Sequence, residues 1–317
     1  MAGITFTALV GCTVPIQQAV MGGISGRQLA VGVAQAGGLG MMHSFGPLPL
    51  EKRIQWVRAN TSGAWGIGFR ADKIDENREA FEYAIEQAPI IELCWADPDR
   101  DLVQQIHRRQ VLAFWQVGDT QSAIAAADCG VDAIILQGSE AGGHLCGDTP
   151  LMALLDSVVG RVDVPLIAAG GISSGHSMAA ALQAGASAVR IGTLFASCIE
   201  SDASDLYRNA LVNAKSKDSV CTTLFGAEWP DAPHRVLGKC IDAAKLDNTD
   251  PIGMYDDGTS RFEIPRFSTL APTRYSSGPH EAMAMYAGTG VEDIRDIESA
   301  KTVVRRLSVQ ARELCAE

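Results

Sequence analysis

The stretch IILQGSEAGGHLCGDTP, from Ile134 to Pro150, contains one complete structural unit of this chain. It starts as an apolar run typical of a buried strand and then breaks into a loop with three glycines before one histidine, His144. Thr149 and Pro150 follow as a typical helix start, with Thr149 as the expected N-cap and Pro150 at the first helical position. A strand, a glycine-rich loop and a helix in this order predict an α/β protein with a parallel sheet.

The same unit recurs through the first two thirds of the chain. Short apolar runs, many of them β-branched, alternate with segments of helical period. The runs predict strands at residues 14–21, 39–44, 64–70, 90–95, 111–117, 133–138, 165–171 and 188–193. The segments between them predict helices at residues 25–36, 49–58, 75–87, 98–109, 120–129, from 149 onward, and at 174–184. Ser25 is the expected N-cap of the first of these helices.

These units predict a closed (β/α)8 TIM barrel. The expected strands are apolar almost throughout, as parallel strands must be when helices cover both faces of the sheet. Eight regular units close most simply into such a barrel. The rival fold, an open doubly wound sheet, is disfavoured because no GxGxxG motif follows the first strand.

The regular pattern ends after residue 205. Residues 206–278 are rich in Pro, Gly and Asp and show little periodicity, which predicts a small irregular insertion or lid subdomain. The tail at 281–314 returns to helical character, and we expect it to pack back on the barrel. The expected barrel domain therefore comprises residues 1–205 and 279–317.

Composition narrows the class of protein. The formal net charge of −11 argues against a nucleic-acid partner or an anionic membrane surface, because both require a basic face. No apolar run reaches the length of a membrane span, and the first residues lack the basic segment of a signal peptide. The eight cysteines are widely spaced without a CxxC pair, which predicts reduced thiols and no metal site. We expect a cytoplasmic protein; a homodimer is one open alternative for its assembly.

The residues that carry chemistry should lie at the carboxyl ends of the strands, where barrels of this class place their active sites. Two glycine clusters, Gly170-Gly171 and Gly192 with Thr193, follow the last two expected strands. Glycine permits close approach of the backbone, so that its N–H groups can bind an anion. These loops therefore predict a phosphate-binding site.

His144 is the candidate for acid–base work, because it lies in a loop and imidazole titrates near neutrality. His43, at the end of the second expected strand, is a candidate for substrate contact. Cys146 lies close to His144 in sequence, but no acyl-transfer context supports a Cys–His nucleophile. Glu140 has two open interpretations: it orients the loop or His144, or it is a solvated loop acid. Trp229 is expected in a core or pocket wall.

Five segments together resemble one known family. They are QGSEAGGHLCG (137–147), PLIAAGGISSG (165–175), RIGTLFASCIES (190–201), PIQQAVMGGIS (15–25) and MYAGTGVEDIRDI (285–297). The chain resembles the nitronate monooxygenases, formerly called 2-nitropropane dioxygenases, which are FMN-dependent TIM barrels. The similarity spans nearly the whole chain and is weakest in the insertion.

The resemblance implies a role for each site residue. The residues expected to bind FMN or line its site are Met21, Gly22, Gly68, Gln137, Gly142, Gly143, Gly170, Gly171, Arg190, Gly192 and Thr193. His144 is the expected catalytic residue, a base for a neutral nitroalkane or a positioning group for a nitronate. His43, Tyr286 and Thr289 are the expected substrate contacts. The flavin would accept an electron from the nitronate and be reoxidised by dioxygen.

Four positions depart from the family pattern. Gly68 stands where an FMN-binding Asn is usual, and Val20 stands where Pro is usual. Arg190 and Thr289 each replace a usual Gln. Three functions therefore stay open: nitronate oxidation, NAD(P)H-dependent reduction of enoyl-thioesters or quinones by an FMN enzyme, and a flavin-free phosphate-ligand barrel acting as a lyase, isomerase or binding protein.

Overall fold

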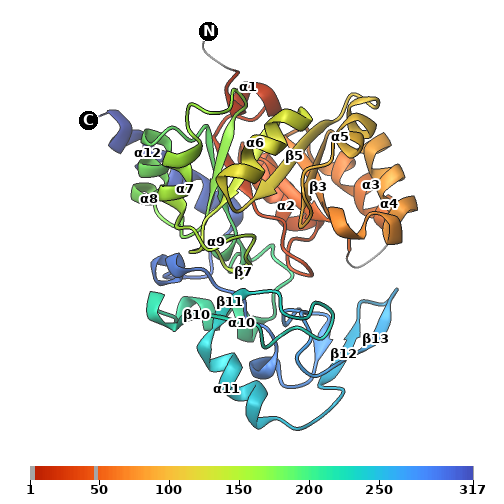
Figure 1. The fold of residues 1–317 in the computed structure, drawn as a ribbon. Coiled ribbons are helices and arrows are strands. Elements are labelled where there is room, and N and C mark those ends of the chain that lie inside the picture. Colours follow the sequence, from red (N-terminus) through yellow and green to blue (C-terminus); the bar gives the residue numbers. More distant parts are fainter. Residues whose placement is uncertain (1–3, 46–48, 317) are drawn as a thin grey trace.

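In a computed structural model, which describes residues 4–45 and 49–316, a barrel stands above a smaller second lobe (Figure 1). Eight parallel strands form the barrel in the order β1-β9-β8-β6-β5-β4-β3-β2. They are β1 (Ile16–Gln18), β2 (Gly40–His43), β3 (Trp65–Arg70), β4 (Ile90–Cys94), β5 (Leu112–Val117), β6 (Ala133–Gln137), β8 (Leu166–Ala169) and β9 (Ala188–Ile191). A parallel bridge between Gln17 and Leu39 joins β1 to β2 and closes the barrel.

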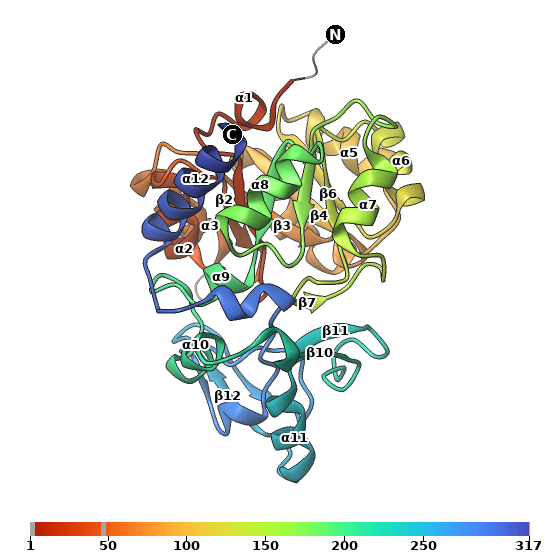
Figure 2. The same ribbon diagram turned by 90° about the vertical axis from the view of Figure 1, so that its left-hand side faces the viewer.

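An outer ring of helices covers the barrel. Its members are α2 (Arg27–Gln35), α3 (Leu50–Asn60), α4 (Arg78–Gln87), α5 (Arg100–His107), α6 (Thr120–Cys129), α7 (Leu151–Val158) and α8 (Gly175–Gln183). The last helix, α12 (Ala300–Ala316), packs against α8 and α2, as expected for the tail (Figure 2). Within the described residues, no helix combines the length and the apolar character that a membrane crossing requires.

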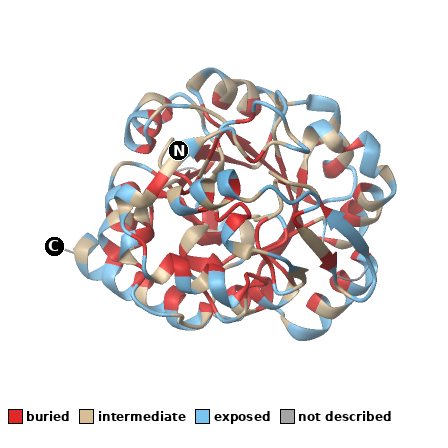
Figure 3. Cartoon of the chain, turned by 90° about the horizontal axis from the view of Figure 1, so that it is seen from below, coloured by how far each residue is buried: buried red, intermediate tan, exposed pale blue. Residues whose placement is uncertain are grey.

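The barrel interior is filled in layers. The short helix α1 (Phe6–Val10) closes the amino-terminal end, where buried Phe6 lies 6.4 Å from the Phe114 ring, centroid to centroid. Ile135 and Ile167 continue this apolar core above them. Seen from below, buried residues lie toward the middle and exposed residues along the surrounding helices (Figure 3). The interior is therefore a packed core, as in barrels that bind their ligands at the carboxyl ends of the strands.

Several expected boundaries were wrong by a few residues. The first strand is three residues long. Ser25 bonds through Oγ to the backbone of Met21 and shapes the following loop instead of capping α2. The N-cap of α2 is Gly26. The helix expected at 75–87 begins with a 3-10 turn, η2 (Asp75–Asn77), and a further 3-10 turn, η1 (Ala71–Lys73), precedes it. Pro150, rather than Thr149, is the N-cap residue of α7.

The second lobe is more regular than its composition indicated. Its elements are α10 (Asp205–Val212), η3 (Ser216–Asp218), β10 (Ser219–Thr222), β11 (His234–Leu237), α11 (Gly238–Leu246), β12 (Gly253–Asp256), β13 (Arg261–Ile264), β14 (Ser276–Ser277), η4 (His280–Ala282) and η5 (Thr289–Asp293). They include two small antiparallel sheets. One sheet takes its third strand, β7 (Gly143–His144), from the barrel loop that follows β6. The lobe is therefore joined by strand pairing to the loop that carries His144.

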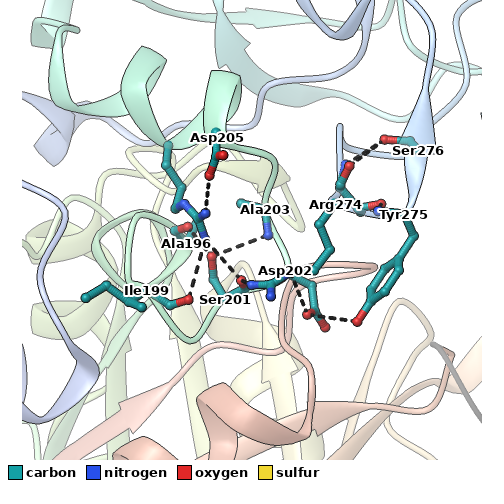
Figure 4. Close-up of polar contacts among 11 residues, drawn as sticks. Ala196, Ile199, Ser201, Asp202, Ala203, Asp205, Arg274, Tyr275 and Ser276 are labelled. Atoms are coloured by element: carbon teal, nitrogen blue, oxygen red, sulfur yellow. Dashed lines mark hydrogen bonds and ion pairs between the residues drawn. The ribbon is translucent and has the colours of Figure 1, made fainter. Parts of the chain in front are cut away.

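A buried carboxylate makes a second joint between the lobe and the barrel (Figure 4). Asp202 forms an ion pair with Arg274 and accepts a hydrogen bond from the Tyr275 hydroxyl, each at 3.3 Å. Its backbone N–H donates to Ile24 in the barrel at 3.0 Å. Burial raises the pKa of Asp202 to about 6, and Arg274 opposes that shift. The lobe is thus fastened on two sides of the barrel mouth.

Candidate active site

A cavity of about 380 Å³ opens at the carboxyl ends of the strands, between the barrel and the second lobe. Fourteen of the expected site residues line it: Met21, Gly22, His43, Gly68, Gln137, Gly142, Gly143, His144, Gly170, Gly171, Arg190, Gly192, Thr193 and Tyr286. Thr289, an expected substrate contact, does not line it, although its neighbours Gly288 and Gly290 do. Its backbone is engaged instead, because its N–H donates to Glu140 and its carbonyl accepts from Ser216.

One rim of the cavity is built from backbone. Gly170 and Gly171 follow β8 in left-handed conformations, with φ of +124° and +66°. Gly192 precedes Thr193, and a Cβ on Gly192 would meet no atom closer than 3.5 Å. The Thr193 hydroxyl accepts from the Gly288 N–H at 3.0 Å and keeps its own proton free to donate. This rim offers open backbone and one hydroxyl to a phosphate.

Two neighbouring serines are engaged elsewhere. The Ser173 hydroxyl donates to Asp293 at 2.7 Å. Ser174 is the N-cap of α8 and accepts from the Ser177 N–H. Their hydroxyls therefore bind other groups of the protein and are not directed to a phosphate at the rim.

The floor of the cavity is polar. Glu92 on β4 and Arg190 on β9 form a buried ion pair across the barrel. Gln17 on β1 donates through Nε2 to the same Glu92 oxygen at 2.8 Å. The guanidinium of Arg190, expected near the phosphate, is therefore directed to the opposite strand. Glu92 was not among the expected site residues; the available signal was a charged residue within an apolar strand.

The loop with His144 is held from three sides. The Gln137 side chain donates to the His144 carbonyl at 3.0 Å and accepts from the Cys146 N–H at 2.7 Å. Arg235 on β11 donates through Nε and Nη2 to the Ser139 carbonyl at 3.1 and 2.9 Å. His144 itself pairs with His234 in the β7–β11 register. Gln137, expected to reach a cofactor, thus holds this loop in place with its amide.

Aromatic side chains surround the His144 ring. Trp229 from the second lobe stacks on it, with ring centroids 4.4 Å apart and planes 19° apart. Trp95 meets it edge-on at 5.9 Å, and Tyr286 lies 5.6 Å away. The Arg70 guanidinium lies 3.3 Å from the Trp229 ring centroid. Trp229 is confirmed in a pocket wall, whereas Trp95 and Arg70 had no signal in their local sequence.

These surroundings keep His144 neutral. Burial lowers the pKa of His144 to about 3, and His234 and Arg70 contribute in the same direction. His234 is fixed in one neutral form, because its Nδ1 bonds to the Ala232 carbonyl while its Nε2 accepts from the Phe225 N–H. His144 can therefore offer a neutral imidazole to a ligand, and it is a weak base.

His43 is also buried and neutral. Its Nε2 accepts from the Gly23 N–H at 3.1 Å, which places its proton on Nδ1. Burial lowers its pKa well below the ordinary value, and Arg53 adds to the effect. Arg53 also donates to the His43 carbonyl at 2.8 Å. His43 is a rigid part of the cavity wall.

At two of the glycines, Gly68 and Gly142, neighbouring atoms leave no space for a side chain. A Cβ on Gly68 would lie 2.5 Å from a methyl carbon of Val20, so Val20 fills the space that a side chain at position 68 would occupy. The two departures from the family pattern are therefore one change of packing. A Cβ on Gly142 would lie 2.5 Å from the Gly288 nitrogen, so Gly142 is required by a close approach of backbones.

The contacts of Glu140 and the surroundings of Cys146 bear on the interpretations given to these two residues. The Glu140 carboxylate accepts from the Leu151 N–H at 2.9 Å and so satisfies the first turn of α7; no contact with His144 is seen among the described residues. Burial raises the pKa of the Cys146 thiol to about 11, which argues against a nucleophile. Within residues 4–45 and 49–316, no group of three His, Cys, Asp or Glu side chains is placed to hold a metal ion.

Comparisons with known proteins agree on one family for this chain. The family model described as nitronate monooxygenase matches residues 5–310. The chain is 34% identical over 233 residues to (3aS,4S,5R,7aS)-5-hydroxy-7a-methyl-1-oxo-octahydro-1H-indene-4-carboxyl-CoA dehydrogenase of Rhodococcus jostii, covering 73% of this chain and 64% of that relative. It is 28% identical over 268 residues to a probable nitronate monooxygenase of Staphylococcus aureus, covering 70% of this chain and 76% of that one.

A solved structure shares the fold. FabK from Thermotoga maritima superposes with a TM-score of 0.82 at 25% identity, covering 98% of this chain and 96% of that one. The chain belongs to the nitronate monooxygenase family, a family of flavoprotein oxidoreductases. The family and the TIM barrel expected from the sequence are both confirmed.

Proposed function

We propose that this protein is an FMN-dependent oxidoreductase that oxidises alkyl nitronates with dioxygen. The observation that carries the proposal is His144, a half-buried, neutral imidazole stacked on Trp229, with the Arg70 guanidinium on the same tryptophan ring. Such a group suits a substrate that arrives already deprotonated and anionic. The family match supports the same reading.

The residues present fit FMN. Gly170, Gly171, Gly192 and Thr193 would hold its phosphate with backbone N–H groups and one hydroxyl. No atom lies within 4 Å of a Cβ placed on Gly22, which leaves open space next to that loop. Bound FMN would supply the electron acceptor that the protein's own side chains lack.

The chain's own residues would bind and orient the substrate. A group with a pKa near 3 has little driving force for removing a proton from carbon, so His144 suits a nitronate better than a neutral nitroalkane. His144 would donate or accept one hydrogen bond at the nitronate. The Arg70 guanidinium, which is paired with Asp72, lies nearby, and Trp95, Trp229 and Tyr286 would exclude water from this side of the cavity.

The test is the anaerobic visible spectrum of the FMN-loaded protein before and after addition of propyl-2-nitronate. Loss or change of the flavin bands, followed by their return when air is admitted, is the expected result. A flavin spectrum that the nitronate leaves unchanged would contradict the proposed reaction. The absence of any band after reconstitution with FMN would leave the flavin-free alternative.

A second candidate is an FMN enzyme that takes hydride from NAD(P)H and acts on a thioester or a quinone. It is favoured by the Rhodococcus jostii relative, whose name describes a dehydrogenase of a carboxyl-CoA. Bleaching of the anaerobic flavin by NADPH, together with no response to the nitronate, would select this candidate. A cytoplasmic location and a homodimer stay predictions.

A further inference from the structure

The cavity floor contains a charge pair in an unusual place. In the closed strand order, β4 and β9 are separated by four steps in either direction. They are therefore opposite one another, and an ion pair between Glu92 and Arg190 must cross the barrel axis. Both side chains are buried, with 1% and 7% of their surface exposed.

This pair dominates the charge of the floor. Among the described residues that line the cavity, the formally charged side chains are Arg70, Glu92 and Arg190. Arg70 lies on the side of the cavity opposite the β8–β9 rim, where it pairs with Asp72 through two bonds of 3.0 and 2.6 Å. The two lining histidines are neutral, as described above. A ligand over the floor therefore meets one cation and one anion.

We propose that the Glu92–Arg190 pair, supported by Gln17, sets the reduction potential of the cofactor over the floor. The inference rests on the proposed function, because it assumes FMN. A cofactor whose phosphate is held at the β8–β9 rim has the space above this floor left for its ring. Reduction adds negative charge to the ring, and charges near the ring tune that change.

The two partners act with opposite sign. Arg190 favours the reduced, more negative cofactor, and Glu92 opposes it through Coulomb interaction in a site with little water. Their pairing holds the floor near neutrality. Gln17 stabilises the carboxylate by donating to it at 2.8 Å and so limits its repulsion of the ring.

The experiment compares the dissociation constants of oxidised and reduced FMN in the full-length protein. In Glu92→Gln, the unpaired cation should raise the affinity for reduced FMN relative to oxidised FMN by about tenfold or more. In Arg190→Gln, the unpaired carboxylate should lower that ratio by a similar factor. The double variant should lie within about threefold of the wild type, because both charges are gone.

The opposite signs separate tuning from a structural role. A pair that only stabilised the fold would weaken the binding of both forms together, and single variants that shift the ratio in the same direction, or not at all, overturn the proposal. Should a single variant not fold, Gln17→Leu keeps both charges and should lower the ratio about threefold; an unchanged ratio there also overturns it.

Failure of the proposed function has a different signature. If FMN binds and the ratio moves as expected while nitronate leaves the spectrum unchanged, the floor tunes a flavin of another activity. If nitronate reduces the flavin and the ratio does not move, this inference alone fails. A protein that binds no FMN contradicts both.

Discussion

The two sides of the cavity are built in different ways. The β8–β9 rim is made of backbone from two short loops, Gly170-Gly171 and Gly192-Thr193. The opposite wall is made of side chains from distant elements, with Trp95 after β4, Arg70 at the end of β3 and Trp229 in the second lobe. We therefore expect the rim to hold the phosphate of the cofactor and the wall to contact the substrate.

The largest expected effect lies on the rim. In Gly192→Asp, a carboxylate would repel the phosphate, and the FMN dissociation constant should rise at least about 100-fold. The fold should tolerate the change, because a Cβ on Gly192 meets no atom closer than 3.5 Å. Titration of the apo-protein with FMN, followed by flavin fluorescence, measures it.

The matched control is Gly238→Asp in the second lobe. A Cβ there has its nearest atom at 3.6 Å, and Gly238 does not line the cavity. FMN affinity should stay within about twofold of the wild type, since this charge is remote from the rim. Equal effects of the two substitutions would contradict the phosphate site.

The packing of Val20 against Gly68 gives the next effect. Gly68→Asn forces a side chain into space that Val20 fills and should destabilise the protein by about 2 kcal/mol. The double variant Val20→Ala, Gly68→Asn should recover at least half of that loss. Urea unfolding at constant pH measures both, and additive losses in the double variant would show that the two positions are independent.

The aromatic wall should respond more weakly and more selectively. Trp229→Ala removes the ring between His144 and Arg70 and should lower kcat/KM for the nitronate about tenfold, with FMN affinity nearly unchanged. Trp56→Ala is the control, because Arg27 lies over the Trp56 ring at 4.8 Å, outside the cavity. A loss of FMN affinity in Trp229→Ala would assign that ring to the cofactor instead.

The rim was predictable because its signal is local. Glycines after two apolar strands predict both a turn and an open backbone. The two strands, β8 and β9, are also neighbours in the sheet, so their loops lie side by side. His144 was predictable for the same reason, since its loop follows β6 directly. The helix boundaries failed where side chains took a different local partner, as Ser25 does with Met21.

The wall was not predictable because its contacts are distant in sequence. Trp95 contacts His144 and Trp229 in a fold where the lobe pairs β11 with β7. Glu92 acquires a role only when closure of the barrel brings Arg190 across the axis. Thr289 is the opposite case: its motif predicted a substrate contact, but it does not line the cavity, and its backbone N–H donates to the Glu140 carbonyl.

The smallest effect tests whether the wall keeps His144 neutral. The folded pKa is about 3 and the ordinary value is 6.5, so between these values the unfolded chain binds a proton that the folded protein does not. Stability should therefore fall as the pH falls below 6.5, by up to about 1 kcal/mol at pH 5.5 from this residue. The His144→Gln variant lacks this pH-dependent contribution to the free energy of unfolding. Asp202 and His43 titrate in both proteins, so their contributions cancel when the variant is compared with the wild type.

Urea unfolding at pH 7.5 and 5.5 should show the wild type losing more stability than the variant. Parallel losses would mean that His144 is protonated in the folded state, in which case the wall presents a cation to the substrate and His144 becomes an acid rather than a neutral hydrogen-bonding group.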